Sequence, residues 1–275
     1  LDYYDIASIS LTNTRVDQTV DGNIITNEGT VTYNDASTGK IVDAWFAYDN
    51  ANSTYNEAYT LDIRALFLPS ARGYGELPDL CIAMSIDNGT GGLLEMVRDV
   101  AAKDATQLFS SDIVTDVKNI MYRWAGVDGL DPASRGVNVD ARSLAFLEKL
   151  TGEPFLQLGY LSNPRVQAGK AVTNAFDDAV EQILARRVLQ GAAAELFDGG
   201  VSYNVATDSF GTPGALDTAF LSDLSDSASS APDTLAFWEN VLLVVATARG
   251  GTANITGADI TALNAAIYDS DSALN

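Results

Sequence analysis

Histidine is absent from this 275-residue sequence, and its absence removes whole classes of catalytic and metal-binding chemistry. Ser-His-Asp and Cys-His nucleophiles, imidazole proton shuttles and the usual zinc sites need an imidazole or several thiolates. Cys81 is the only cysteine, so no disulfide can form within the chain. It lies in the apolar run DLCIAMSI, which favours a buried small side chain over a reactive thiol. Catalysis by this chain would therefore depend on carboxylates.

Basic residues are scarce: 16 Lys and Arg stand against 37 Asp and Glu, a formal charge of −21. Such a charge repels phosphate backbones and anionic lipids, so we expect no nucleic-acid partner, whereas divalent cations are compatible with it. Long apolar runs are also missing, because VLLVVATA at 241–248 is far shorter than the roughly 20 residues that span a bilayer. We therefore expect a globular chain without a membrane span, with a core built from its 47% apolar residues.

The hydrophobic pattern changes from a period of two to a period of about 3.6 along the chain, which predicts two regions. A β-rich region is expected at 1–75, with strands between residues 5 and 68, because IASISL alternates and NIITNEGTVTY is rich in β-branched residues. In KIVDAWFAYD both alternating sets are apolar around Ile41 and Val42, which predicts a strand covered on both faces. A helical domain is expected at 76–275. The predicted fold class is α+β, a small N-terminal antiparallel β-sheet followed by a mainly α-helical domain.

Caps and glycine stops predict where individual helices begin and end. A helix at 111–125 is expected to start from Ser110 or Ser111 and to stop at Gly126. Its buried stripe is expected to consist of Ile113, Val117, Ile120 and Trp124. Asp140 is expected to cap a helix that ends at Gly152.

Three more helices are expected toward the C-terminus. One runs from about residue 163 to 191, and the last begins after Thr256. The run 232–251 is apolar all round, which predicts the central buried helix. Turn-rich composition predicts surface loops at 201–214 and at 222–233.

The stretch WAGVDGLDPASRGVNVDARSLAFLEKLTG at 124–152 contains three aspartates, Asp128, Asp131 and Asp140, around a Gly- and Pro-containing loop. It could be a calcium loop, a cleavable Asp131-Pro132 site or a connector between two helices. An EF-hand count from Asp131 places Gly136 correctly at position 6 but puts alanine or arginine at three ligand positions. These three failing positions hold Ala133, Arg135 and Arg142. A count from Asp49 fails as well, so we favour the connector.

Three other patterns have both a functional and a structural interpretation. NGTGGLLEMV, with Gly89, Gly91 and Gly92, could bind an anion at a helix start but lacks the Lys of a phosphate loop, so a flexible helix start is favoured. The GYG of ARGYGELPD predicts an exposed aromatic loop, with a structural turn as the default. A helical face at 177–181 carries three acids that could serve glycoside hydrolysis, although such groups are usually solvated. These acids are Asp177, Asp178 and Glu181.

Several blocks resemble a known protein family. They are DIASISL, DGNIITNEGTVTYNDASTGKIVDAWF, LFLPSARGYGELPDL and RWAGVDGLDPASRGVNVDARSLAFLEKLTGEPF, which together cover roughly residues 5–155. They are similar to a region of very large secreted bacterial RTX, or haemolysin-type calcium-binding, proteins. The resemblance implies type I secretion, calcium as a cofactor, and an extracellular, cell-surface location. The family's glycine- and aspartate-rich nonapeptide repeats are missing here, so its calcium ligands carry over to no residue of this chain.

We therefore favour a non-catalytic structural or interaction module of a secreted, calcium-associated RTX-type surface protein, adhesin or toxin. The start LDYYDIAS has no initiator Met and no signal peptide, which predicts a module of a longer protein. Its expected partners are neighbouring modules of that parent chain and cell-surface glycans or proteins. Two alternatives stay open: a carboxylate-based polysaccharide-active enzyme, and calcium-dependent autoprocessing at Asp131-Pro132.

Overall fold

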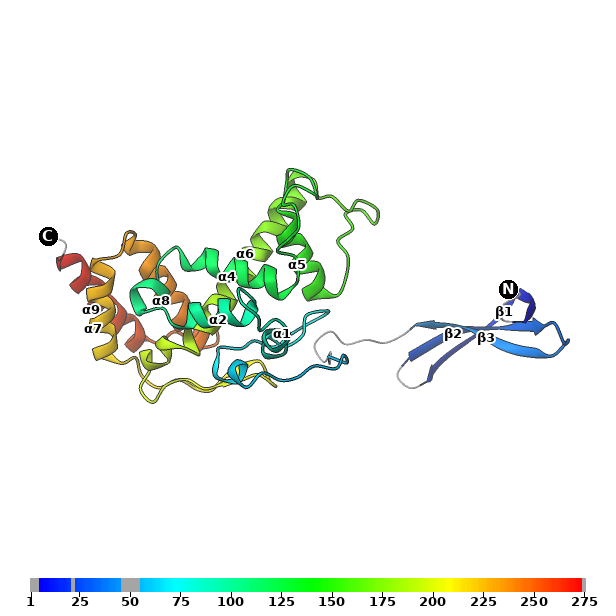
Figure 1. The fold of residues 1–275 in the computed structure, drawn as a ribbon, viewed down its shortest axis with the longest axis horizontal. Coiled ribbons are helices and arrows are strands. Elements are labelled where there is room, and N and C mark those ends of the chain that lie inside the picture. Colours follow the sequence, from blue (N-terminus) through cyan, green and yellow to red (C-terminus); the bar gives the residue numbers. More distant parts are fainter. Residues whose placement is uncertain (1–4, 21–22, 46–54, 274–275) are drawn as a thin grey trace. The chain divides into compact units, whose positions relative to one another are not determined.

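The computed structural model describes residues 5–20, 23–45 and 55–273 (Figure 1). Its contacts divide the chain into two compact units, Leu1–Asn50 and Ala51–Asn275. The first unit holds an antiparallel sheet and the second is mainly helical, so the fold class is α+β, as the sequence predicted.

The sheet is a meander of three antiparallel strands in the order β1-β2-β3. The strands are β1 Ile6–Val20, β2 Asn23–Tyr33 and β3 Thr38–Trp45. The turn between β2 and β3 is closed by the Tyr33 amide, which donates to the Ser37 carbonyl at 2.9 Å. Irregularities in the register interrupt the pairing of β1 with β2 at three places.

The strand that was predicted to be covered on both faces is covered on neither face by residues of its own unit. Ile41 is 39% exposed and its neighbour Val42, on the opposite face, is 46% exposed. Val31 is the one apolar side chain that is fully buried among the described residues of this unit. Two adjoining apolar sets were interpreted as two covered faces, but three strands alone supply no second layer to cover either of them.

Residues 55–79 contain no strand, although strands were predicted as far as residue 68. The segment forms a short 3₁₀ helix, η3 Ile63–Phe67, with Ala65 fully buried. It attaches to the helical unit through the Asp62 amide, which donates to Ser85 Oγ at 3.0 Å. The unit boundary after Asn50 thus precedes the change of pattern that the sequence shows after residue 75.

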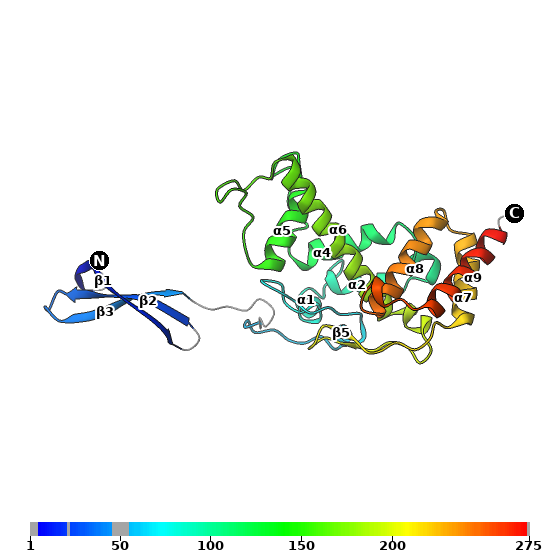
Figure 2. The ribbon, with the colours of Figure 1, turned by 180° about the vertical axis from the view of Figure 1, so that it is seen from behind.

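The second unit is built around α4, α6 and α8, with α2 against α4 and α7 against α9 (Figures 1 and 2). Its core is continuous and includes a group of rings in which Tyr122 stacks on Phe176 at 5.3 Å and Phe146 meets Phe176 edge-on. The helices are α1 Leu80–Ile86, α2 Leu93–Ala101, α3 Ala105–Leu108, α4 Ile113–Trp124, α5 Ala141–Thr151, α6 Val166–Leu189, α7 Thr218–Ser229, α8 Thr234–Ala248 and α9 Gly257–Ala273.

Most helix boundaries agree with the caps and stops in the sequence. The stripe of α4 is buried as predicted, and Gly126 follows the helix with a φ of 65°. Its N-cap was predicted wrongly, because Asp112 takes that position, without a side-chain cap, in place of either serine. In α5 the prediction is confirmed: Asp140 Oδ1 accepts the Arg142 amide at 2.9 Å, and Gly152 ends the helix in the left-handed conformation.

The prediction of a loop at 222–233 was wrong, because most of this segment belongs to α7. Asp217 caps the helix by accepting the amides of Ala219 and Phe220 at 2.8 and 2.9 Å. The buried face of α7 includes Ser225 and Ala228 beside its leucines. Small polar residues on the buried stripe weakened the helical pattern, and the serine-rich composition was interpreted as a turn signal.

Candidate functional site

The GYG turn lies between η3 and α1, and close packing imposes both of its glycines. A Cβ on Gly73 would lie 2.1 Å from the Leu77 carbonyl oxygen, closer than any side chain tolerates. Gly75 has a φ of 61°, and a Cβ there would lie 2.5 Å from the Lys149 oxygen. Tyr74 is therefore held in one position, half-buried in a structural turn, which was the default interpretation, and not in an exposed loop.

Tyr74 is one of three side chains that meet at Asp208. The Tyr74 hydroxyl donates to Asp208 Oδ2 at 2.8 Å, and the Tyr203 hydroxyl donates to Oδ1 at 2.6 Å. Arg186 of α6 donates to the same Oδ1 through Nη1. We call these residues, together with Arg72, the Asp208 cluster.

Asp208 itself lies in a short hairpin between β4 Tyr203–Asn204 and β5 Ser209–Phe210. Its φ of 49° is in the left-handed region, which Asp and Asn tolerate better than other side chains. Arg72 fastens the same hairpin, because its Nη1 donates to the Ala206 carbonyl at 2.9 Å. One carboxylate thus joins the GYG turn, the hairpin and α6, three segments that lie far apart in the sequence.

Both tyrosines of the cluster stay protonated at neutral pH. Burial is the main cause that raises the pKa of Tyr203, and the hydrogen bond to Asp208 raises it further. Burial followed by the same carboxylate also raises the pKa of Tyr74. A phenol whose pKa lies above its ordinary value is a hydrogen-bond donor and not a base or nucleophile.

A pocket of about 160 Å³ adjoins the cluster. Arg72, Tyr74, Arg186 and Asp208 contribute its polar wall. Its apolar wall consists mainly of Trp124, Phe146, Leu150 and Ile183. Because both Asp208 oxygens already accept hydrogen bonds, this arrangement is suited to holding segments together.

The three acids that the sequence grouped on α6 take different places. Asp177 Oδ1 accepts a hydrogen bond from Lys118 Nζ at 2.8 Å. Asp178 and Glu181 instead line an open groove of about 500 Å³ between α6 and the end of α8, beside Arg186. The triple is therefore divided into one ion pair and two acids at a groove.

The Asp131-Pro132 loop is an ordered connector between α4 and α5. Asp131 Oδ1 accepts the Ala133 amide at 3.0 Å, and the Pro132 carbonyl accepts the Ala141 amide at 2.9 Å. Asp128 pairs with Arg123 at 3.1 Å, while Asp140 caps α5, so the three aspartates of this stretch have separate partners. Within residues 5–20, 23–45 and 55–273, no group of three potential ligands among Asp, Glu and Cys converges on one point. Asp49 lies outside the described residues.

The glycine-rich start of α2 is satisfied by the chain's own carboxylates. The Leu93 amide donates to Asp87 Oδ2 at 2.9 Å, and the Gly91 amide donates to Glu95 Oε2 at 2.8 Å. The Arg123 hydrogen bond is the main cause that lowers the pKa of Asp87, so this carboxylate stays ionised. An anion at this helix end would have to displace both acids.

A second candidate surface lies where the α4–α5 and α5–α6 connections run side by side. Arg135 joins them, because it pairs with Glu148 of α5 at 3.0 Å and donates to the Ser162 carbonyl at 2.6 Å. The Asn138 side chain adds a bond to the Pro164 carbonyl at 3.1 Å. Figure 1 shows the α5–α6 connection as a green loop that projects from the helices.

This projecting region presents large apolar side chains to solvent. Val137 is 96% exposed, Leu158 is 68% exposed and Tyr160 is 70% exposed. Leu158 has a φ of 58° at the end of a hairpin that Gln157 and Leu161 close with two backbone hydrogen bonds. A leucine in the left-handed conformation costs free energy that only the surrounding structure can offset. We call Val137, Leu156, Leu158 and Tyr160 the apolar tip.

Sequence reasoning missed Tyr203, Arg186 and Asp208, because nothing local marks them as partners of the GYG turn. Tyr74 and Asp208 are separated by 134 positions, and only the tertiary fold joins them. No helix among the described residues is long and apolar enough to cross a membrane. No protein-family model, no curated protein and no solved structure matches this chain.

Proposed function

We propose that this chain is a non-catalytic structural or interaction module of a secreted, calcium-associated, RTX-type surface protein, adhesin or toxin. The apolar tip is the observation that carries the interaction role. Large exposed apolar side chains on two ordered connections that hydrogen bonds join are typical of protein-binding surfaces. The hydrogen bonds of Arg135 and Asn138 fix this loop, so docking there orders little additional chain.

The Asp208 cluster supports the non-catalytic part of the proposal. Its carboxylate is occupied by three donors, and its two tyrosines are kept as phenols. The three donors hold this carboxylate in place and neutralise its charge through Arg186, an arrangement suited to a structural ion pair. The cluster instead fixes the hairpin and the GYG turn against α6.

The proposed partners are neighbouring modules of the parent chain and proteins or glycans of the cell surface. Calcium association is proposed at the level of the parent protein, because the aspartates of the 124–152 stretch each have a separate partner. Secretion by the type I route is consistent with the single cysteine and the charge of −21.

Hydrogen exchange at the apolar tip tests this proposal. Amides at 156–161 should become more protected when the chain is part of its longer parent protein than when it is alone. Leu158→Ser and Tyr160→Ser should remove the added protection, whereas Leu235→Ser, at a 70% exposed site on α8, serves as the matched control. Equal exchange in both contexts would contradict docking through this surface.

A carboxylate enzyme acting on polysaccharides is the second candidate, because Asp178 and Glu181 line the same open groove. Reducing ends should not appear when the protein is incubated with acidic and neutral bacterial polysaccharides. Release of reducing ends that disappears in Asp178→Asn or Glu181→Gln would replace the proposed function with this one.

Autoprocessing is tested separately. Two fragments divided at Asp131-Pro132 after calcium addition would establish it.

A further inference from the structure

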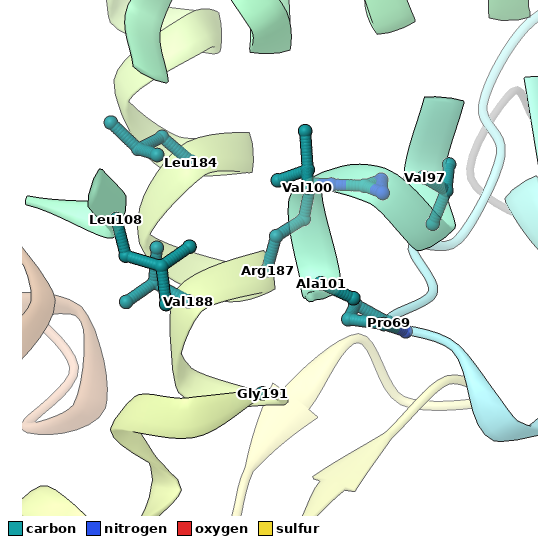
Figure 3. A pocket seen from close by; sticks show the side chains of 9 residues that line it. All are labelled: Pro69, Val97, Val100, Ala101, Leu108, Leu184, Arg187, Val188 and Gly191. Atoms are coloured by element: carbon teal, nitrogen blue, oxygen red, sulfur yellow. The ribbon is translucent and has the colours of Figure 1, made fainter. Parts of the chain in front are cut away.

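Arg187 is a charged side chain in the interior of the helical unit. It extends from α6 toward α2 and is 3% exposed (Figure 3). Arg186, the preceding residue, points to the Asp208 cluster and is paired there. The two neighbouring arginines therefore have opposite surroundings.

The Arg187 guanidinium has no protein partner among the described residues. Its Nε, Nη1 and Nη2 atoms are all buried and all without a hydrogen bond. A guanidinium carries five N–H donors, and buried arginine is normally paired with a carboxylate or with carbonyl oxygens. Leaving all of these donors unsatisfied is among the costliest arrangements in a protein interior.

Neutralisation of Arg187 does not remove this cost. Burial lowers the pKa of Arg187 to about 10, which is still well above neutral pH. The side chain therefore keeps its positive charge under physiological conditions. A charge that stays in an apolar interior requires a counter-charge close to it.

The space beside Arg187 is small and apolar. A cavity of about 10 Å³ adjoins the side chain. Figure 3 shows it between α2 and α6, where Arg187 passes Val100 and Val97. The other lining residues are Pro69, Ala101, Leu108, Leu184, Val188 and Gly191, so no carboxylate lines the cavity. This volume corresponds to about one water-sized particle.

We infer that this cavity binds one monatomic monovalent anion, chloride under physiological conditions, against the Arg187 guanidinium. A carboxylate ligand needs more room than a single water-sized space. A water molecule fits, but it brings no charge and would find few polar partners other than the guanidinium. A halide is somewhat larger than water, so the apolar lining must move slightly to admit it, but it supplies the missing negative charge and accepts the guanidinium N–H groups.

Anion-dependent stability tests the inference. Urea unfolding would be followed in sodium chloride, sodium bromide and sodium gluconate at equal ionic strength, so that general screening is the same in all three. Chloride at about 100 times its dissociation constant should reduce the unfolding equilibrium constant about 100-fold relative to gluconate. The effect should saturate with concentration, and bromide should replace chloride.

Variants and a direct observation complete the test. Arg187→Met fills similar space without the charge and should abolish the difference between chloride and gluconate, whereas Arg98→Met, at an exposed position, should preserve it. In crystals grown with bromide, an anomalous peak should lie beside the Arg187 guanidinium. If Arg187→Met does not fold, this peak decides. Equal stability of the wild type in chloride and gluconate, or a cavity that contains only water, would overturn the inference.

Discussion

Asp208→Asn is the most informative single change at the Asp208 cluster, because it removes the charge and little else. Asparagine has the same size as aspartate, and it tolerates the left-handed backbone that a φ of 49° imposes. Its Oδ1 can still accept the Arg186 and Tyr203 hydrogen bonds, but an NH₂ group replaces Oδ2, which accepts the Tyr74 hydroxyl. The Arg186 guanidinium would then face an uncharged amide in place of a carboxylate.

The expected loss of stability follows from the burial of this ion pair. Breaking a fully buried pair by removing one partner costs about 3–5 kcal/mol, and exposed pairs contribute about 0–1 kcal/mol. The side chains of Arg186 and Asp208 are 23% and 16% exposed, which places them between these limits but nearer the buried one. We therefore expect Asp208→Asn to reduce the free energy of unfolding by about 2–3 kcal/mol.

Urea unfolding monitored by circular dichroism at 222 nm measures this loss. The midpoint should fall while the slope with urea stays constant, because the change affects stability and not the surface that unfolding exposes. Asp99→Asn is the matched control, since Asp99 is 71% exposed beside Arg98 and its replacement should not move the midpoint. An unchanged midpoint in Asp208→Asn would refute the interpretation of this cluster as a clamp.

Three further predictions concern the helical unit and one concerns calcium. Asp259 is buried; burial raises the pKa of Asp259, but the hydrogen bonds from Arg249 and Thr256 outweigh burial and lower it overall. The stability that ionised Asp259 contributes to the fold is therefore complete above its unfolded-state pKa of about 4 and disappears as the pH falls through its folded-state pKa. In urea unfolding, Asp259→Asn should cost about 3 kcal/mol at pH 7 and progressively less in acid. Gly75→Ala should cost more than about 1 kcal/mol and lower the melting midpoint, because the added Cβ would meet the Lys149 oxygen. A midpoint equal to that of the wild type would contradict the required left-handed turn. Asp140→Ala should cost about 1 kcal/mol through the lost cap, measured in the same assay. Calcium should stabilise this chain no more than sodium chloride of equal ionic strength if calcium binds elsewhere in the parent protein; a saturable excess in thermal unfolding would locate a calcium site within it.

Helices that have an N-cap residue and a terminal glycine next to their apolar stripe could be predicted from the sequence, and those without these signals could not. For α5, a capping Asp140 and a terminal Gly152 bracket the apolar stripe, and both signals are local. For α7, the buried stripe contains Ser225 and Ala228, so composition outweighed periodicity. The sheet was predicted correctly, but the burial of its faces could not be predicted from its own residues, because burial depends on which other layer packs on a strand.

The sites show the same limit more strongly. The GYG turn was noticed in the sequence, but the carboxylate that holds Tyr74 is 134 positions away in a hairpin of two-residue strands. Arg187 did leave a signal, since it continues the buried stripe of α6 through Phe176, Val180 and Leu184 at the helical period. A charged residue on a buried stripe indicates a pairing requirement, although the sequence does not tell which partner meets it.

The charge composition strengthens the inference about Arg187. With 37 acidic and only 16 basic residues, carboxylates are the most abundant potential partners in this chain. Other arginines of the helical unit use them: Arg186 pairs with Asp208, and Arg249 pairs with the buried Asp259 at 2.7 Å. A shortage of acids therefore does not explain why no acid lines the cavity beside Arg187. An interior charge with no carboxylate beside it, in a chain so rich in carboxylates, is expected when the counter-charge comes from solution.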